Sequence, residues 1–115
     1  MLQKANRLKK RKEFSYIYKK GSVAHAPDFM VHYTRAFKPY PQIGISVSKQ
    51  VGNSVARSRA KRIISEACRL NLSNFAIKNY VITARPSIAG KKSTEIERQL
   101  LALLKKHNLM RGQDV

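Results

Sequence analysis

A helical stripe of apolar residues between two strand-like segments limits the folds open to this chain. Residues 54–70 carry apolar side chains at steps of four and three, the period of one buried helical face. They are Ala56, Ala60, Ile63, Ala67 and Leu70. Residues 43–47 alternate apolar with small or polar side chains, and residues 80–84 form a short buried-type strand. The order predicts a βαβ unit, whose crossover is right-handed by default.

The flanking segments extend this unit. A short helix is predicted from Lys10 to Lys20, with Gly21 after its last turn. Residues 29–34 alternate as a half-buried strand, one of two or three strands that precede the central helix. Thr94 and Glu97 form a capping box that starts a final amphipathic helix. The predicted fold is a two-layer α/β (α+β) sandwich in the order α-β-β-β-α-β-α.

The size and cysteine content suit one intracellular domain. The 115 residues allow a single modest core, so residues 1–115 are one predicted domain with residues 1–9 as a basic arm. No apolar run is long enough to span a bilayer, and no apolar segment follows the basic N-terminus as in a secretory signal. The single cysteine, Cys68, excludes an internal disulfide. We therefore expect a cytoplasmic protein with no membrane partner.

The charge indicates the kind of partner. The chain holds 24 Lys and Arg against 6 Asp and Glu, a formal net charge of +18. Residues 29–65 contain no acid at all, whereas an ordinary soluble surface mixes both signs. A polyanion relieves such self-repulsion, and nucleic acid gains affinity by releasing counterions. A lipid surface is less favoured, because the chain lacks a long helix with a wide apolar face.

The residues offer no convincing catalytic constellation. Glu95 and Glu97 lie two positions apart on a helix and point in different directions. Cys68 fits a packed side chain, although basic neighbours can lower the pKa of such a thiol. The histidines have no metal-ligand spacing; they are His25, His32 and His107. The sequence therefore predicts no catalytic residues and no directly bound metal, which disfavours a protein-only nuclease.

The central helix has the pattern of a phosphate-binding surface. Asn53 or Ser54 can cap its first turn, after a loop at Gly52 that permits unusual backbone angles. One arc of a helical wheel, opposite the apolar stripe, is cationic and polar; it holds Arg57, Ser58, Lys61, Arg62, Ser65 and Arg69. A solvated helix face would pair these cations with acids four residues away. We therefore favour phosphate binding over simple solvation.

Aromatic side chains gather in the first forty residues among basic ones. They are Phe14, Tyr18, Phe29, Tyr33, Phe37 and Tyr40. Core packing explains Phe29 and at least one of Phe14 and Tyr18. The others fit a stacking platform for unpaired bases in a positive groove. The sequence alone leaves both interpretations open for any one residue.

The stretch "GISVSKQVGNSVARSRAKRIISEACR", residues 44–69, resembles the signature of the bacterial ribonuclease P protein subunit. In that family a Ser-x-Ser-Lys strand end and x-Gly-Asn precede a helix that opens with an Arg-Asn-Arg-x-Lys-Arg core. "NRLKKRKEFSYIYKKG", residues 6–21, is similar to the family's first helix. Three positions depart from the pattern: Ser58 replaces the usual Asn, Ser65 stands at an often basic position, and Gln50 replaces a frequent lysine.

The resemblance implies a left-handed βαβ crossover around the basic helix, against the default. It implies a protein without its own active site, which joins a catalytic RNA. That RNA, with magnesium as cofactor, removes the 5′ leader of precursor tRNA. The implied partners are the catalytic RNA and precursor tRNA, with no obligate protein partner. The alternative function is a ribosomal-type RNA-binding protein without a role in cleavage.

The resemblance also assigns residues by position. The implied contacts with the catalytic RNA, or with metal near it, are Asn53, Arg57, Ser58, Arg59, Lys61 and Arg62. The implied cleft for the single-stranded leader is lined by Phe14, Tyr18, Tyr33, Ser46, Ser48 and Lys49. Lys49 would supply a phosphate contact beside that cleft.

Overall fold

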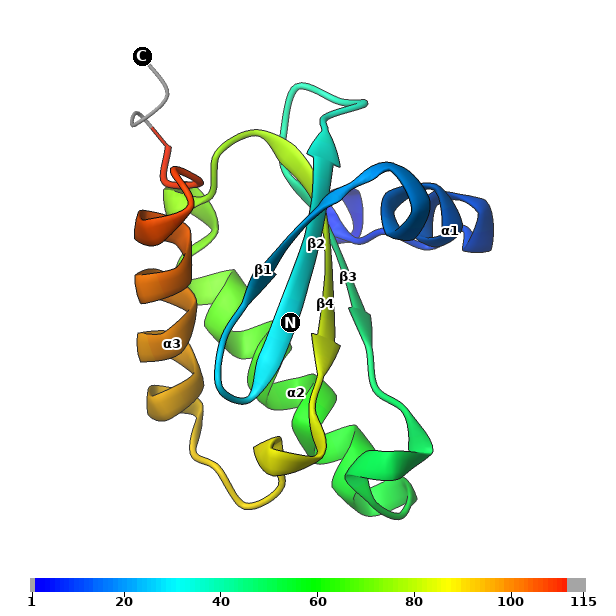
Figure 1. Cartoon of the computed structure of the whole chain (residues 1–115), viewed down its shortest axis with the longest axis vertical. Helices are drawn as coiled ribbons and strands as arrows, with labels where there is room; N and C mark the ends of the chain where they lie inside the picture. Colours follow the sequence, from blue (N-terminus) through cyan, green and yellow to red (C-terminus); the bar gives the residue numbers. More distant parts are fainter. Residues whose placement is uncertain (1, 112–115) are drawn as a thin grey trace.

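The computed structural model describes residues 2–111, and it has one mixed sheet with helices on both faces (Figure 1). The four strands are β1 (Ser22–His25), β2 (Phe29–Arg35), β3 (Gln42–Ser46) and β4 (Lys78–Ala84). The three α-helices are α1 (Arg11–Lys20), α2 (Ser54–Leu70) and α3 (Ser93–Lys106). Their order along the chain is α-β-β-β-α-β-α, which confirms the predicted order.

The sheet has the spatial order β1-β2-β4-β3, with β3 parallel to β4 and the other neighbours antiparallel. In Figure 1, β3 and β4 run downward, β3 lies to the right of β4, and α2 passes behind the sheet. The β3-α2-β4 crossover is therefore left-handed, and the right-handed default is wrong for this chain. The helix has to lie on the face where Ile43 and Ile82 project, because its apolar stripe is buried there.

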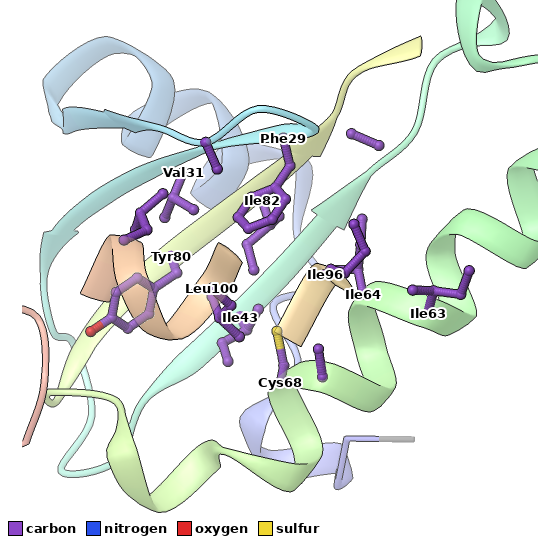
Figure 2. Packing of buried hydrophobic residues seen from close by; sticks show 14 of the residues in the cluster. Phe29, Val31, Ile43, Ile63, Ile64, Cys68, Tyr80, Ile82, Ile96 and Leu100 are labelled. Carbon is purple, nitrogen blue, oxygen red and sulfur yellow. The ribbon is translucent and has the colours of Figure 1, made fainter. Parts of the chain in front are cut away.

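The main core lies between the sheet and the pair α2 and α3 (Figure 2). Alternate residues of the strands project into it, as the period of two requires. The labelled members in Figure 2 are Phe29, Val31, Ile43, Ile63, Ile64, Cys68, Tyr80, Ile82, Ile96 and Leu100. Cys68 is packed in this core as the sequence predicts, and its burial raises the pKa of the thiol.

Helix α1 covers part of the other face of the sheet and forms a much smaller apolar cluster. Its fully buried residue is Ile17, which joins Leu8 and Val81, with Phe14 packed at the edge. Leu8 also donates its backbone N–H to the carbonyl of Ile43, at 3.1 Å. Part of the predicted basic arm is thus fixed against the edge strand β3, with Leu2 buried as well.

Three local predictions about the helices are wrong. Helix α3 begins after Lys92 without a side-chain cap, and Glu97 instead accepts a hydrogen bond from the amide of Asn71, at 2.9 Å. Leu70 was expected on the buried stripe but is 58% exposed. Ser65 was expected on the exposed arc but is buried, and it borders the same hollow as Leu2 of the N-terminal segment.

Candidate nucleic-acid interface

The first part of the candidate site is the surface where α1 meets the sheet, which carries residues of the predicted leader cleft. We call this surface the cleft. Gly44 lies on β3 under the ring of Phe14, and a Cβ atom added to Gly44 would lie 2.4 Å from that ring. Only glycine allows this approach, which matches the small, polar second face predicted for the strand. The aromatic ring therefore rests directly on backbone at one end of the cleft.

Tyr18 forms the next part of the cleft wall, one helical turn after Phe14. Its hydroxyl lies 3.1 Å from the hydroxyl of Thr83 on β4, and its ring meets His32 edge-on at a centroid distance of 4.8 Å. Thr83 pairs in register with Ser46 on β3. The cleft thus carries two aromatic rings, an imidazole and two hydroxyls on a surface of small residues.

His32 brings an unsatisfied polar atom into this region. Its Nδ1 atom is buried without a hydrogen-bond partner in the described chain. Burial, with a smaller contribution from nearby His25, lowers the pKa of His32 below its usual value, so the neutral ring is favoured. His25 in turn lies 2.9 Å from the guanidinium of Arg85.

The prediction that Tyr33 lines the same cleft is wrong. Tyr33 follows His32 on β2 and therefore points to the opposite face, where it packs against the main core. The sequence already indicated this orientation, because Tyr33 alternates in step with Phe29 and Val31. Both of these are deeply buried in the structure. His32, interpreted from the sequence as an ordinary strand residue, takes the place expected for Tyr33.

The segment after β3 places Ser48 and Lys49 beyond the end of the cleft. The Ser48 hydroxyl accepts a hydrogen bond from the backbone N–H of Gln50, at 3.3 Å, and so caps the short turn Lys49–Val51. Both Ser48 and Lys49 are exposed. Gly52 follows with a φ of 146°, a backbone conformation that is strained for any residue with a side chain. This turn directs the chain into α2.

The N-terminus of α2 is capped as the sequence predicts. The Asn53 side-chain oxygen accepts a hydrogen bond from the backbone N–H of Ala56, at 2.9 Å. No acidic residue stands in the first turn, so the positive end of the helix dipole is not neutralised there. The first helical turns therefore combine a positive dipole end with four basic side chains.

The predicted cations of α2 occupy two flanks rather than one arc. Arg59 and Arg62 border an open hollow of about 500 Å³ together with Ser58. Lys61 lies on the other flank, beside a hollow of about 280 Å³ whose rim also carries Arg7. The remaining lining of the second hollow includes Leu2, Leu8, Lys9, Phe14, Ile43, Ile45 and Ser65. Arg57 is half-buried, while Arg59, Lys61 and Arg62 are exposed.

The acids near these surfaces are engaged elsewhere. Glu66 pairs with Arg69 at the C-terminal half of α2, which lowers the pKa of the glutamate. Buried Asp28 accepts a hydrogen bond from Gln99, at 2.6 Å, and lies 3.5 Å from the ammonium of Lys91. In residues 2–111, no three His, Cys, Asp or Glu side chains gather as a possible metal site. None of the helices described there is long and apolar enough to cross a membrane.

An α+β sandwich with a left-handed crossover, aromatic rings beside one face of the sheet and unneutralised cations on α2 has the surface chemistry of a small nucleic-acid-binding protein. Its family follows from comparison with known proteins: residues 2–108 match the family model described as Ribonuclease P. The chain belongs to the ribonuclease P protein family. It is thus related to the protein component of an endoribonuclease that processes tRNA.

Relatives support this membership along almost the whole chain. The chain is 42% identical to the ribonuclease P protein component of Clostridium beijerinckii, over 95% of this chain and 94% of the relative. Among solved structures, the RNase P protein of Staphylococcus aureus has a TM-score of 0.84 at 32% identity, covering 94% of this chain and 100% of its own. The Thermotoga maritima RNase P protein has a TM-score of 0.79 at 26% identity, covering 87% and 96%.

Proposed function

We propose that this protein binds the catalytic RNA of ribonuclease P and helps it remove the 5′ leader of precursor tRNA. The observation that carries the proposal is the cleft on the α1 face, where Phe14, Tyr18 and His32 border a surface of small residues. Unpaired bases stack on aromatic rings, and each such contact is worth about 1–3 kcal/mol. A surface that combines aromatic rings with small polar side chains suits an extended single strand better than a folded duplex.

The cations of α2 are proposed to bind the catalytic RNA. Arg59 and Arg62 on one flank, and Arg57 with Lys61 toward the other, would contact two separate runs of phosphates. Ser58, which borders the hollow with Arg59 and Arg62, would add a hydroxyl contact. Asn53 has an internal role as the helix cap, so it would act by fixing the first turn rather than by contributing charge.

The proposal assigns the chemistry of cleavage to the RNA. The acids of the described residues serve structural contacts, as Asp28 does with Gln99 and Glu95 does with Arg98. This donor set does not fit a magnesium site, since that ion prefers several oxygen ligands around one point. Magnesium therefore belongs, in this proposal, mainly to the RNA. The described protein residues bind and orient the nucleic acids.

The test combines the purified protein with its cognate catalytic RNA at low magnesium and compares precursor with mature tRNA. We expect faster 5′ processing than with RNA alone and a higher affinity for the precursor. Tyr18→Ala should lower precursor affinity by about fivefold or more, because one stacking contact is lost, while mature tRNA is unaffected. Arg62→Ala should weaken catalytic-RNA binding and reduce its salt slope by about one ion.

Tyr33→Leu is the matched control, since Tyr33 lies on the same sheet but on the other face. Its ratio of precursor to mature affinity should equal that of the wild type. If the protein gives no gain in processing over RNA alone, the proposal is wrong. Binding that ignores the leader would favour the alternative of a ribosomal-type RNA-binding protein without a role in cleavage.

A further inference from the structure

Two aromatic side chains outside the cleft lie exposed against each other on the outer side of α1. Tyr16 comes from α1 and Phe37 from the loop between β2 and β3, and their ring centroids are 5.6 Å apart with an interplanar angle of 57°. Tyr16 remains 44% exposed and Phe37 47% exposed. Each ring thus contacts its neighbour and still presents about half of its surface to solvent.

This aromatic pair is separate from the cleft. Tyr16 and Tyr18 are two positions apart on α1, which places them roughly 200° apart around the helix axis. Tyr18 faces Thr83 and His32 on the sheet, whereas Tyr16 faces the loop that carries Phe37. Helix α1 therefore has aromatic side chains on two opposite flanks, and the cleft accounts for only one of them.

The surroundings of the pair are cationic. Lys12 and Lys20 stand four residues before and after Tyr16, so they share its flank of the helix. Lys38 directly follows Phe37. Within residues 2–111 the structure records no carboxylate partner for these three lysines. The acid of α1, Glu13, accepts a hydrogen bond from the backbone N–H of Lys10 instead.

We infer that Tyr16 and Phe37 form a second stacking site, which takes an unpaired nucleotide of the 5′ leader beyond the cleft. This inference rests on the proposed leader binding. Exposed rings supply the surface for a base, and the flanking lysines supply charge for its phosphates, the combination that binds single-stranded nucleic acid. The leader is the favoured source because it is unpaired and because α1 borders both surfaces, whereas the bases of a folded catalytic RNA are mostly paired.

The experiment measures the affinity of the assembled ribonucleoprotein for precursor tRNAs with a short leader, about five nucleotides, and a long one, about fifteen. With the wild type, the longer leader should bind more tightly. Tyr16→Leu and Phe37→Leu should each reduce that gain by about fivefold, since leucine keeps an apolar contact between α1 and the loop but removes the stacking face. Tyr16→Phe should retain the gain, because the ring remains.

The controls separate this inference from the proposed function. Tyr18→Ala should weaken both leader lengths, because it acts within the cleft. If Tyr16→Leu leaves the gain from the longer leader unchanged while Tyr18→Ala weakens binding, the second site is absent and the proposed function stands. If Tyr16→Leu instead weakens binding of the catalytic RNA without any tRNA, the stacked base belongs to that RNA and the inference about the leader is overturned.

Discussion

The two faces of the sheet are built on different principles. The face toward α2 and α3 buries a large continuous apolar cluster that includes Phe29, Tyr80 and Ile82. The face toward α1 buries a small cluster around Ile17 and Val81 and leaves polar groups beside it. Asn79, fully buried on β4, has no hydrogen-bond partner for either side-chain amide atom in the described chain.

We infer from this difference that the α2 and α3 face supplies most of the stability and that the α1 face is suited to binding. Burial of apolar area is the main source of folding free energy, so the α2 and α3 face holds the molecule together. A partly covered, polar face gives up some of that free energy, but it leaves the aromatic ring of Tyr18 partly exposed to a ligand. Tyr18 stays 40% exposed on this face, because α1 covers only part of it.

The largest expected effect tests this division on adjacent residues of β4. Ile82→Ala should cost about 2–5 kcal/mol of unfolding free energy, because it leaves a cavity in the main core. Val81→Ala on the α1 face removes one carbon fewer from a smaller cluster and should cost about 2 kcal/mol. Urea unfolding of both variants measures the difference. Equal losses would mean that the α1 face is a core of the same kind.

The same strand pattern shows how much the sequence could predict. The order of elements followed from periodicity, and the cationic helix from the lack of acids before Glu66. The assignment of Tyr33 failed although the alternation with Val31 placed it on the core face, because the resemblance was given more weight than the period. Ser65 is buried where it borders the same hollow as Leu2, more than sixty residues away in sequence, and no local pattern contains this long-range arrangement.

Gly44→Ala should perturb the α1 face with a moderate loss of stability. The new methyl would lie 2.4 Å from the Phe14 ring, which must move, at a cost of about 1–3 kcal/mol. Precursor affinity should fall together with stability, since the ring leaves its place in the cleft. In a Phe14→Ala background the same substitution should cost almost nothing, because its clash is gone. If Gly44→Ala still lowers stability in the Phe14→Ala background, the cost arises from the β3 backbone rather than from Phe14.

Substitutions at Asn53 separate a structural from an electrostatic contribution at the start of α2. Asn53→Ala removes the cap on Ala56 and should cost about 1 kcal/mol of stability in urea unfolding. Asn53→Asp retains a capping oxygen, so its stability should stay close to that of the wild type. Its carboxylate should nevertheless weaken binding of the catalytic RNA, because it repels phosphate. If Asn53→Asp binds RNA as well as the wild type does, phosphates do not approach this turn.

The smallest expected effect is a pH dependence that belongs to the cleft face. The folded-state pKa of His32 lies below its usual value of 6.5, mainly through burial and then through His25. As the pH falls through about 6.5, the unfolded chain takes up a proton before the folded chain does, so stability decreases. The decrease ends below the folded-state pKa, where both states are protonated. Tyr18 meets this imidazole edge-on and His25 acts on it electrostatically, while Arg85 contacts His25.

The measurement is the difference in Tm between about pH 7.5 and about pH 5.5 for the wild type and for His32→Asn. The variant should lose less stability over this interval, because asparagine does not titrate. Ile82→Ala is the control, since a change on the core face should lower Tm at both pH values without altering the difference. If His32→Asn shows the same decrease in Tm as the wild type, His32 does not govern the pH response. Burial of this imidazole on the α1 face then does not lower stability at acid pH.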